Sequence, residues 1–136
     1  MLKVGYYTAA LFDLHCRILL TMSTPELSDA DYQRLAYALL SAVEKQLDEW
    51  LDQDIIDVDA HRSGGLLELA FPNGSKMILN TQPPLQELWL AARGGGFHFR
   101  WRDGQWVDTR DGQVLMACLS HHASLQAGLP LNFRAD

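Results

Sequence analysis

The sequence has few cysteines, and neither is placed for metal binding or redox chemistry. Cys16 and Cys118 are far apart and belong to no paired motif. A small extracellular scaffold held by disulfides needs a denser framework of cysteines. We therefore expect a reducing compartment and predict a cytoplasmic protein.

Basic residues are also scarce. Eleven Lys and Arg stand against 17 Asp and Glu, so the formal net charge is -6. A protein whose main partner is nucleic acid needs a basic surface to meet the phosphates. The charge balance therefore disfavours nucleic acid and favours cations or basic proteins as partners.

No hydrophobic run is long enough to cross a membrane, which takes roughly 18 apolar residues. The most apolar stretch lies at the N-terminus, where Asp13, His15 and Arg17 interrupt it. It also lacks the order of a signal peptide, an apolar core followed by a small-residue cleavage site. We expect residues 1–21 to be a misassigned start or a dispensable N-terminal extension, and residues 22–136 to form a single domain without a membrane anchor.

Two helices are predicted, one near each end of this domain. The first covers residues 28–50, where Ser28 and Asp31 resemble a capping box. Its apolar residues recur at steps of three and four and form one stripe: Tyr32, Leu35, Ala36, Leu39, Val43, Leu47 and Trp50. The second helix covers residues 111–127, is ended by Gly128, and has this predicted buried side: Val114, Leu115, Cys118, Leu119, His122 and Leu125.

The residues between the helices alternate as strands do. In residues 54–60, Ile56, Val58 and Ala60 alternate with two aspartates, and strands are also predicted over residues 85–92 and 95–107. Asn-Gly at 73–74 and Asp-Gly at 103–104 indicate hairpin turns. The predicted fold is therefore α+β: a two-layer sandwich with both helices on one face of an antiparallel sheet of five to six strands.

Acidic residues are concentrated where the first helix ends and the first strand begins. Like charges about 6 Å apart repel by roughly 0.7 kcal/mol in water, so a cation or a basic partner would relieve the crowding. Carboxylates are hard oxygen donors that suit iron, manganese or calcium. The alternative is an ordinary solvated face. The candidate metal ligands are Glu44, Asp48, Glu49, Asp52, Asp54, Asp57 and Asp59.

This acidic group forms no ligand cage, since the glycine that an EF-hand loop requires is missing. We therefore predict a weak, open surface for cations or for a basic partner. No Ser-His-Asp or Cys-His arrangement is evident, and a ferroxidase centre would need His beside the acids in a bundle core. The sequence predicts no enzyme.

Trp89 is the second candidate for binding. Leu88, Leu90 and Ala92 share the predicted core side of their strand, which places Trp89 on the opposite, open face of the sheet. An exposed Trp on a sheet is a common anchor of protein interfaces. The alternative is that a loop or the C-terminal tail covers it.

Several segments resemble the bacterial frataxin (CyaY) family over residues 31–133. They are "LDEW", "IDVD", "PNGSKMILNTQPPLQELWLAARGGGFHF", "DGQW" and "LQAGLPLNF". The resemblance implies the same two-helix fold and a role in iron–sulfur cluster assembly. It also implies weak binding of ferrous and ferric iron through an acidic ridge, and docking on a cysteine desulfurase and an iron–sulfur scaffold protein.

Carried onto this sequence, the ridge corresponds to the seven acidic residues above. The partner-binding positions of the open sheet correspond to Asn80, Gln82 and Trp89. We predict an iron-binding regulator of the desulfurase–scaffold complex. The alternative is an iron donor or iron-storage chaperone for cluster assembly. We expect a monomer, with iron-driven oligomers left open.

Overall fold

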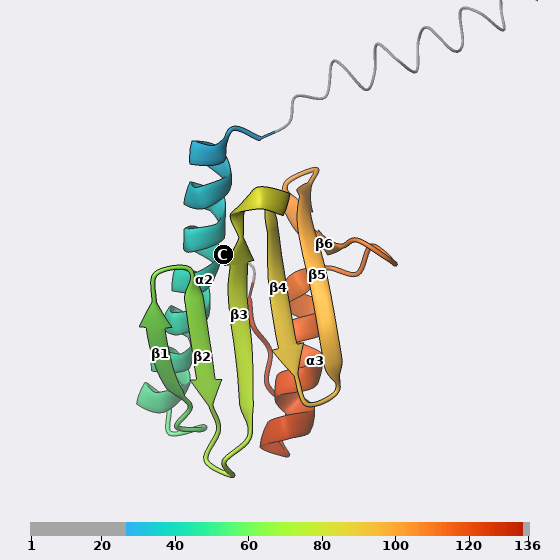
Figure 1. Ribbon diagram of the computed structural model, residues 1–136. Helices are drawn as coiled ribbons and strands as arrows, with labels where there is room; N and C mark the ends of the chain where they lie inside the picture. Colours follow the sequence, from blue (N-terminus) through green and yellow to red (C-terminus); the bar gives the residue numbers. More distant parts are fainter. Residues whose placement is uncertain (1–26, 135–136) are drawn as a thin grey trace, which may run out of the picture.

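Both helices lie on one face of a single antiparallel sheet (Figure 1). The structure is a computed structural model and describes residues 27–134, so the interpretation of residues 1–21 lies outside the described residues. The described helices are α2 (Asp29–Asp52) and α3 (Leu115–Ala127), with a 3-10 turn, η1 (Pro83–Leu85). The strands are β1 (Asp59–Ser63), β2 (Leu66–Ala70), β3 (Lys76–Gln82), β4 (Glu87–Ala92), β5 (Gly95–Arg102) and β6 (Gln105–Asp108).

The six strands pair in sequence order, and every neighbouring pair is antiparallel. This confirms the predicted α+β class and the helix–sheet–helix order. The predicted turn at 73–74 is also confirmed, because Gly74 has a φ of 88° and Asn73 Oδ1 accepts the Ser75 N–H at 3.0 Å. Within the described residues, no helix combines the length and hydropathy that a membrane crossing requires.

Helix α2 begins as its sequence predicts. Ser28 is the N-cap, and its Oγ accepts the N–H of Asp31 at 3.0 Å. The apolar stripe faces the sheet, with Tyr32, Ala36, Val43 and most of the other predicted residues buried. The helix therefore has one face on the core and one in solvent.

The Tyr32 hydroxyl joins α2 to the ends of two strands. It donates a hydrogen bond to the backbone carbonyl of Glu87 at 2.6 Å and accepts the N–H of Gln82 at 3.0 Å. Burial raises the pKa of Tyr32 above its ordinary value. The two backbone groups belong to the last pair of the β3–β4 ladder, so the phenol satisfies polar groups where the strands part.

The core side of the sheet follows the predicted alternation. Each fully buried Leu or Phe contributes roughly 1.5–3 kcal/mol relative to exposure, and these side chains make up most of the sheet's share of the core: Leu67, Leu69, Met77, Leu79, Leu88, Leu90 and Phe99. The chain after α3 completes the core. Its Phe133 ring packs edge-on against Trp50 with centroids 4.7 Å apart.

The predicted first strand begins too early. Residues 54–58 precede β1, which starts at Asp59, although Ile56 and Val58 still contact the core. Asp54 has a φ of 58°, which no strand accommodates. Ala60 is exposed on the edge strand rather than buried. Residues 53–58 therefore form the turn and the irregular connection between α2 and β1, and are not part of a strand.

The second helix also starts later than predicted, at Leu115 instead of residue 111. Asp108 and Asp111 side chains accept the N–H groups of Arg110 and Gln113, at 2.7 and 2.9 Å, and fold the intervening residues into turns. Leu125, predicted on the buried side, is 64% exposed. Cys118 is buried as expected, and burial raises its pKa to about 11.

His122 on α3 carries an unusual buried atom. Its Nδ1 is shielded from solvent and has no hydrogen-bond partner within residues 27–134. The imidazole packs against the Phe97 ring, with centroids 4.8 Å apart, and lies beside His121 at 5.0 Å. Burial, and secondarily the neighbouring His121, lower the pKa of His122 below its ordinary value.

Tyr32→Phe should lower the free energy of unfolding by about 1–3 kcal/mol, because two buried backbone groups lose their shared partner. Urea denaturation measures this. Tyr37→Phe is the matched control from the same helix and should change stability by no more than about 0.5 kcal/mol. Equal losses in both variants would contradict the assigned role of the Tyr32 hydroxyl.

Stability should also fall as the solution is acidified through about pH 6.5, the ordinary pKa of an unfolded His. The folded pKa of His122 is lower, so below that pH the unfolded chain binds more protons and the free energy of unfolding declines. His122→Gln should flatten this slope in urea titrations between about pH 7.5 and 5.5. His121→Gln should retain most of it, and a slope unchanged by His122→Gln would refute the assignment.

Candidate metal and partner surfaces

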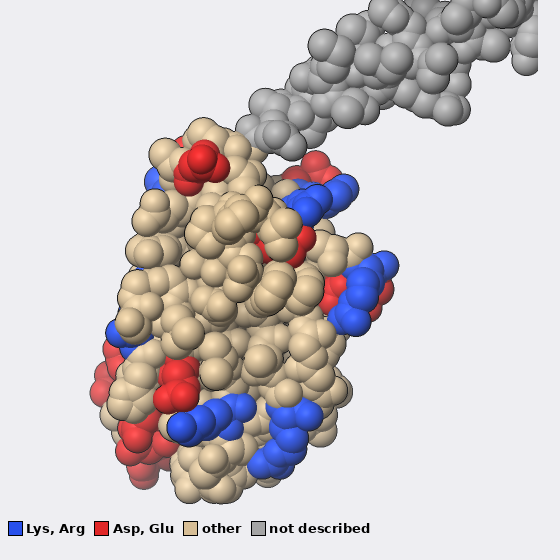
Figure 2. Space-filling model, in the orientation of Figure 1, with Lys and Arg blue, Asp and Glu red and all other residues tan. Residues whose placement is uncertain are grey.

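The acidic residues singled out in the sequence lie along one border of the molecule. They come from the second half of α2, the segment that follows it and the start of β1: Glu44, Asp48, Glu49, Asp52, Asp54, Asp57 and Asp59. We call this set the acidic edge. Figure 2, seen from the open face, shows acidic side chains gathered at the border where Figure 1 places β1 and the end of α2.

Two members of the acidic edge are neutralised by arginines. Arg62 on β1 contacts Glu44 at 2.6 Å, and Arg134 contacts Glu49 at 2.8 Å. Glu49 also accepts a hydrogen bond from Gln46 at 3.3 Å. Both glutamates are half-buried, so these pairs stabilise the fold and leave less carboxylate for a metal. Neither pairing could be predicted from the sequence, because the partners lie 18 and 85 residues apart in the chain.

The five aspartates of the acidic edge are exposed and unpaired. Within residues 27–134, no Lys or Arg forms an ion pair with them. Nor do any three His, Cys, Asp or Glu of that range lie close enough to hold one metal ion. The arrangement suits cations whose shell is completed by water, or a partner surface with several positive charges. The aspartates are Asp48, Asp52, Asp54, Asp57 and Asp59.

Asp54 has a backbone role in addition to its charge. It takes the left-handed conformation after α2, and its N–H donates to the Leu51 carbonyl at 3.0 Å. The Ile55 N–H donates to the Trp50 carbonyl at 2.8 Å. Together these bonds form a Schellman motif, in which glycine usually occupies the position of Asp54. The helix ends within two residues of the predicted position, but the cap itself is not evident from the sequence because the usual glycine is absent.

The predicted partner-binding residues lie together on the open face of the sheet. Asn80 on β3 stands directly opposite Trp89 on β4, and Trp89 stands opposite His98 on β5. Gln82 is two residues further along β3, opposite Glu87. The middle of this face is largely free of charged side chains (Figure 2).

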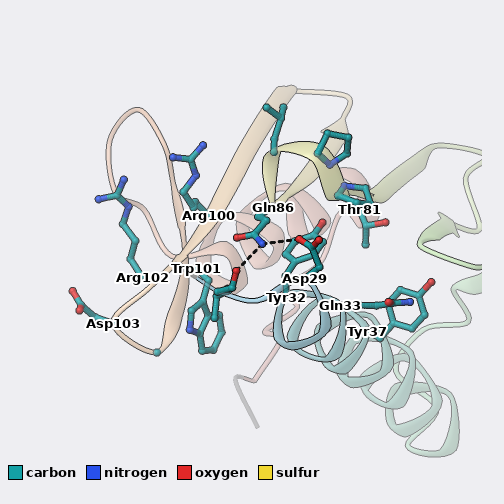
Figure 3. A pocket seen from close by; sticks show the side chains of 15 residues that line it. Asp29, Tyr32, Gln33, Tyr37, Thr81, Gln86, Arg100, Trp101, Arg102 and Asp103 are labelled. Atoms are coloured by element: carbon teal, nitrogen blue, oxygen red, sulfur yellow. Dashed lines mark hydrogen bonds between the residues drawn. The ribbon is translucent and has the colours of Figure 1, made fainter. Parts of the chain in front are cut away.

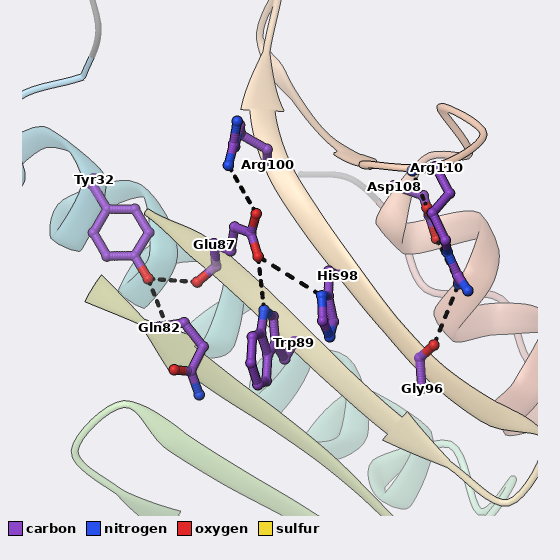
Figure 4. Close-up of polar contacts among 9 residues, drawn as sticks. All are labelled: Tyr32, Gln82, Glu87, Trp89, Gly96, His98, Arg100, Asp108 and Arg110. Atoms are coloured by element: carbon purple, nitrogen blue, oxygen red, sulfur yellow. Dashed lines mark hydrogen bonds and ion pairs between the residues drawn. The ribbon is translucent and has the colours of Figure 1, made fainter. Parts of the chain in front are cut away.

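Trp89 is half-buried by its neighbours on the open face. Its ring stacks on the His98 imidazole with centroids 4.1 Å apart and planes 6° from parallel. Its indole N–H donates to Glu87 Oε1 at 2.9 Å (Figure 4). The covering groups are therefore strand neighbours in the same sheet, and the strand parity predicted from the sequence is correct.

Glu87 is the buried anchor of this group. Only 8% of its side chain is exposed, and its carboxylate meets Trp89, Arg100 at 3.0 Å and His98 at 3.9 Å. Strand alternation places Glu87 on the open face with Trp89, but nothing in the sequence indicates that its carboxylate is buried. Burial of a carboxylate requires such partners. The hydrogen bond from the indole N–H to Glu87 also holds the Trp89 ring in one orientation.

A separate hollow of about 1450 Å³ lies between the start of α2, η1 and the β5–β6 turn (Figure 3). Tyr32, Tyr37 and Trp101 supply aromatic walls, and Gln86 crosses it to Asp29 Oδ1 at 3.1 Å. The residues that line it include no His or Cys. The residues that line this hollow therefore do not suggest a catalytic site, and the acidic edge remains the stronger candidate for binding.

A model of the frataxin-like domain matches residues 25–129. The chain belongs to the frataxin family. Relatives in Burkholderia mallei (strain SAVP1) and Burkholderia pseudomallei (strain K96243) are 50% identical over 109 residues, which cover 80% of this chain and 100% of theirs. Both are named iron–sulfur cluster assembly protein CyaY. Frataxins of this kind are not enzymes, which confirms that prediction.

Solved frataxin structures share the fold. Frataxin from Psychromonas ingrahamii is 32% identical, with a TM-score of 0.72, and the match covers 79% of this chain and 99% of that one. Trimeric frataxin from Saccharomyces cerevisiae, described as complexed with ferrous iron, is 25% identical with a TM-score of 0.59; the match covers 76% and 89%. The fold inferred from the sequence is therefore confirmed independently.

The Schellman motif allows a direct test of Asp54. Asp54→Gly should leave the free energy of unfolding unchanged or raise it by up to about 1 kcal/mol, because glycine adopts a positive φ without strain. Asp54→Ala should lower it by about 1 kcal/mol. Both variants remove the same carboxylate, so a difference between them in urea denaturation measures the cost of a positive φ at position 54. A larger loss with Gly than with Ala would contradict the cap.

Proposed function

We propose that this frataxin acts in cytoplasmic iron–sulfur cluster assembly as an iron-binding, non-catalytic regulator of the cysteine desulfurase–scaffold complex. The observation that carries the proposal is the row of five exposed aspartates on the acidic edge, which form no ion pair with a Lys or Arg of residues 27–134. Their charge is not balanced within the described fold, and a basic surface on the desulfurase would balance it.

The distribution of these aspartates supports docking more than metal storage. A storage or high-affinity site would bring several carboxylates to one point, and no three come together within residues 27–134. Spread along the border, they match an extended basic surface instead. Electrostatic attraction of this kind speeds association and orients the partner.

Iron, ferrous or ferric, is the proposed cargo of the same surface. Single carboxylates completed by water bind hard cations weakly. Asp48, Asp52, Asp54, Asp57 and Asp59 would therefore share iron with the docking role, with Glu44 and Glu49 contributing only after release from their arginines. Partner and metal compete for the same oxygens under this proposal.

The open face is the proposed second contact, with the scaffold protein. Asn80, Gln82 and Trp89 are neighbours there, and Glu87 fixes the indole. A rigid aromatic plane beside amide groups suits a protein interface because little side-chain entropy is lost on binding. The protein would act as a monomer until iron or a partner is added.

A second candidate function is an iron donor or store. The yeast relative complexed with ferrous iron favours it. An anaerobic titration followed by residue-resolved NMR separates the two, since a donor must bind ferrous iron at stoichiometric concentration. Saturation near one equivalent would favour the donor, whereas weak binding displaced by the desulfurase would favour the regulator.

The docking claim is tested by removing charge at three aspartates. Asp48→Asn, Asp57→Asn and Asp59→Asn combined should weaken binding to the desulfurase about tenfold, if each exposed pair contributes roughly 0.5 kcal/mol. The corresponding changes to Lys should abolish the effect on desulfurase rate. Calorimetry at low salt and a cysteine-turnover assay measure the two.

The matched control removes the same charge elsewhere. Asp29, Asp103 and Asp111 changed together to Asn keep the hydrogen-bond acceptors that Asp29 and Asp111 supply, and Asn tolerates the positive φ of Asp103. This variant should bind nearly as tightly as the unmodified protein. Equal weakening by both triple variants would show that net charge, and not the acidic edge, is recognised.

A further inference from the structure

Two aliphatic side chains stand in the middle of the acidic edge. Leu51 is 51% exposed and Ile55 is 43% exposed. Among the described residues only five large hydrophobic side chains are exposed, and these are two of them. Asp52 and Asp54 lie between them in the chain, Asp48 precedes Leu51 by three residues, and Asp57 follows Ile55 by two. Aliphatic side chains supply no ligand to a hard cation, so cation binding does not explain their exposure here.

The fold holds both residues firmly. Leu51 lies in the last turn of α2, and its carbonyl accepts the Asp54 N–H of the Schellman motif. The Ile55 backbone is bonded to Trp50, whose ring is buried against Phe133. The turn that carries the two side chains is therefore fixed on the core, so a partner would lose little conformational entropy in ordering it.

We propose that Leu51 and Ile55 form the apolar centre of a docking surface for a basic protein partner. The partner would place an aliphatic or aromatic side chain on them while its Lys or Arg residues meet the surrounding aspartates. This inference rests on the proposed function of the acidic edge and adds the chemistry of the partner. Interfaces are organised in this way, with an apolar centre inside a charged rim.

The negative charge around Leu51 and Ile55 determines which kind of partner can cover them. A second copy placed symmetrically would bring two acidic edges together, and like charges would repel across the contact. An anionic lipid surface would be repelled for the same reason. A protein segment that is both basic and apolar is attracted by the rim and gains from covering the centre.

The test compares two double variants, each of which replaces two exposed aliphatic residues by Gln, one pair within the acidic edge and the other outside it. Leu51→Gln with Ile55→Gln should weaken binding of the desulfurase–scaffold complex about tenfold, as expected for two apolar contacts. Leu85→Gln with Leu125→Gln, at exposed leucines of η1 and α3, should change it by less than about twofold. Thermal unfolding of both variants verifies that they fold.

Salt and iron provide independent readouts. The loss caused by Leu51→Gln with Ile55→Gln should persist at about 0.5 M salt, where ionic contacts are screened, and the anaerobic iron titration should be unchanged. Wild-type affinity in this variant, with weakening in the triple Asn variant, would overturn the inference while the proposed function stands. Wild-type affinity in the double Gln variant and in the triple Asn variant would overturn the inference and the proposed docking function together. Altered iron binding in the double Gln variant would also overturn the inference.

Discussion

The contact of α2 with the sheet through Tyr32 is the interaction on which the placement of both candidate surfaces depends. The Tyr32 hydroxyl bonds to the Gln82 N–H at the end of β3 and to the Glu87 carbonyl at the start of β4. These two bonds fix the position of the helix along the strands. At the other end of the helix, Trp50 packs on Phe133. Held at both ends, α2 brings its acidic end beside β1. Because α3 covers the same face, the opposite face of the sheet is left open for Trp89 and its neighbours (Figure 1).

The negative charge of this region has two roles that the sequence does not separate. The glutamates at 44 and 49 are half-buried and bind arginines from β1 and from the C-terminal segment, so they hold distant parts of the chain together. The five aspartates are exposed and form no ion pair with a Lys or Arg of residues 27–134, and on the proposed function they meet a partner or iron. A similar division applies to the open face, where Glu87 is buried and positions the indole while Asn80 and Trp89 form the surface.

Much of the fold followed from local patterns. The N-cap at Ser28, the stripe of α2, the alternation of buried residues in β4 and the Asn-Gly turn each depend on neighbouring residues, and each was correct. The strand predicted from residue 54 begins too early because Asp54 adopts a glycine-like conformation, which composition does not reveal. The late start of α3 depends on the Asp108 and Asp111 side chains competing for backbone N–H groups. The pairings of the acidic edge with Arg62 and Arg134 are contacts of the folded chain, and no spacing rule indicates them.

Gly94 and His122 show how such long-range contacts restrict the sequence itself. The backbone of Gly94 does not require glycine, but a Cβ there would lie 2.7 Å from the buried Nδ1 of His122. The two positions are therefore coupled: a side chain at 94 requires the imidazole to shift or to be replaced by a smaller group. The residues tolerated at position 94 should consequently depend on which residue occupies position 122, so the restriction on Gly94 comes from another element of the fold.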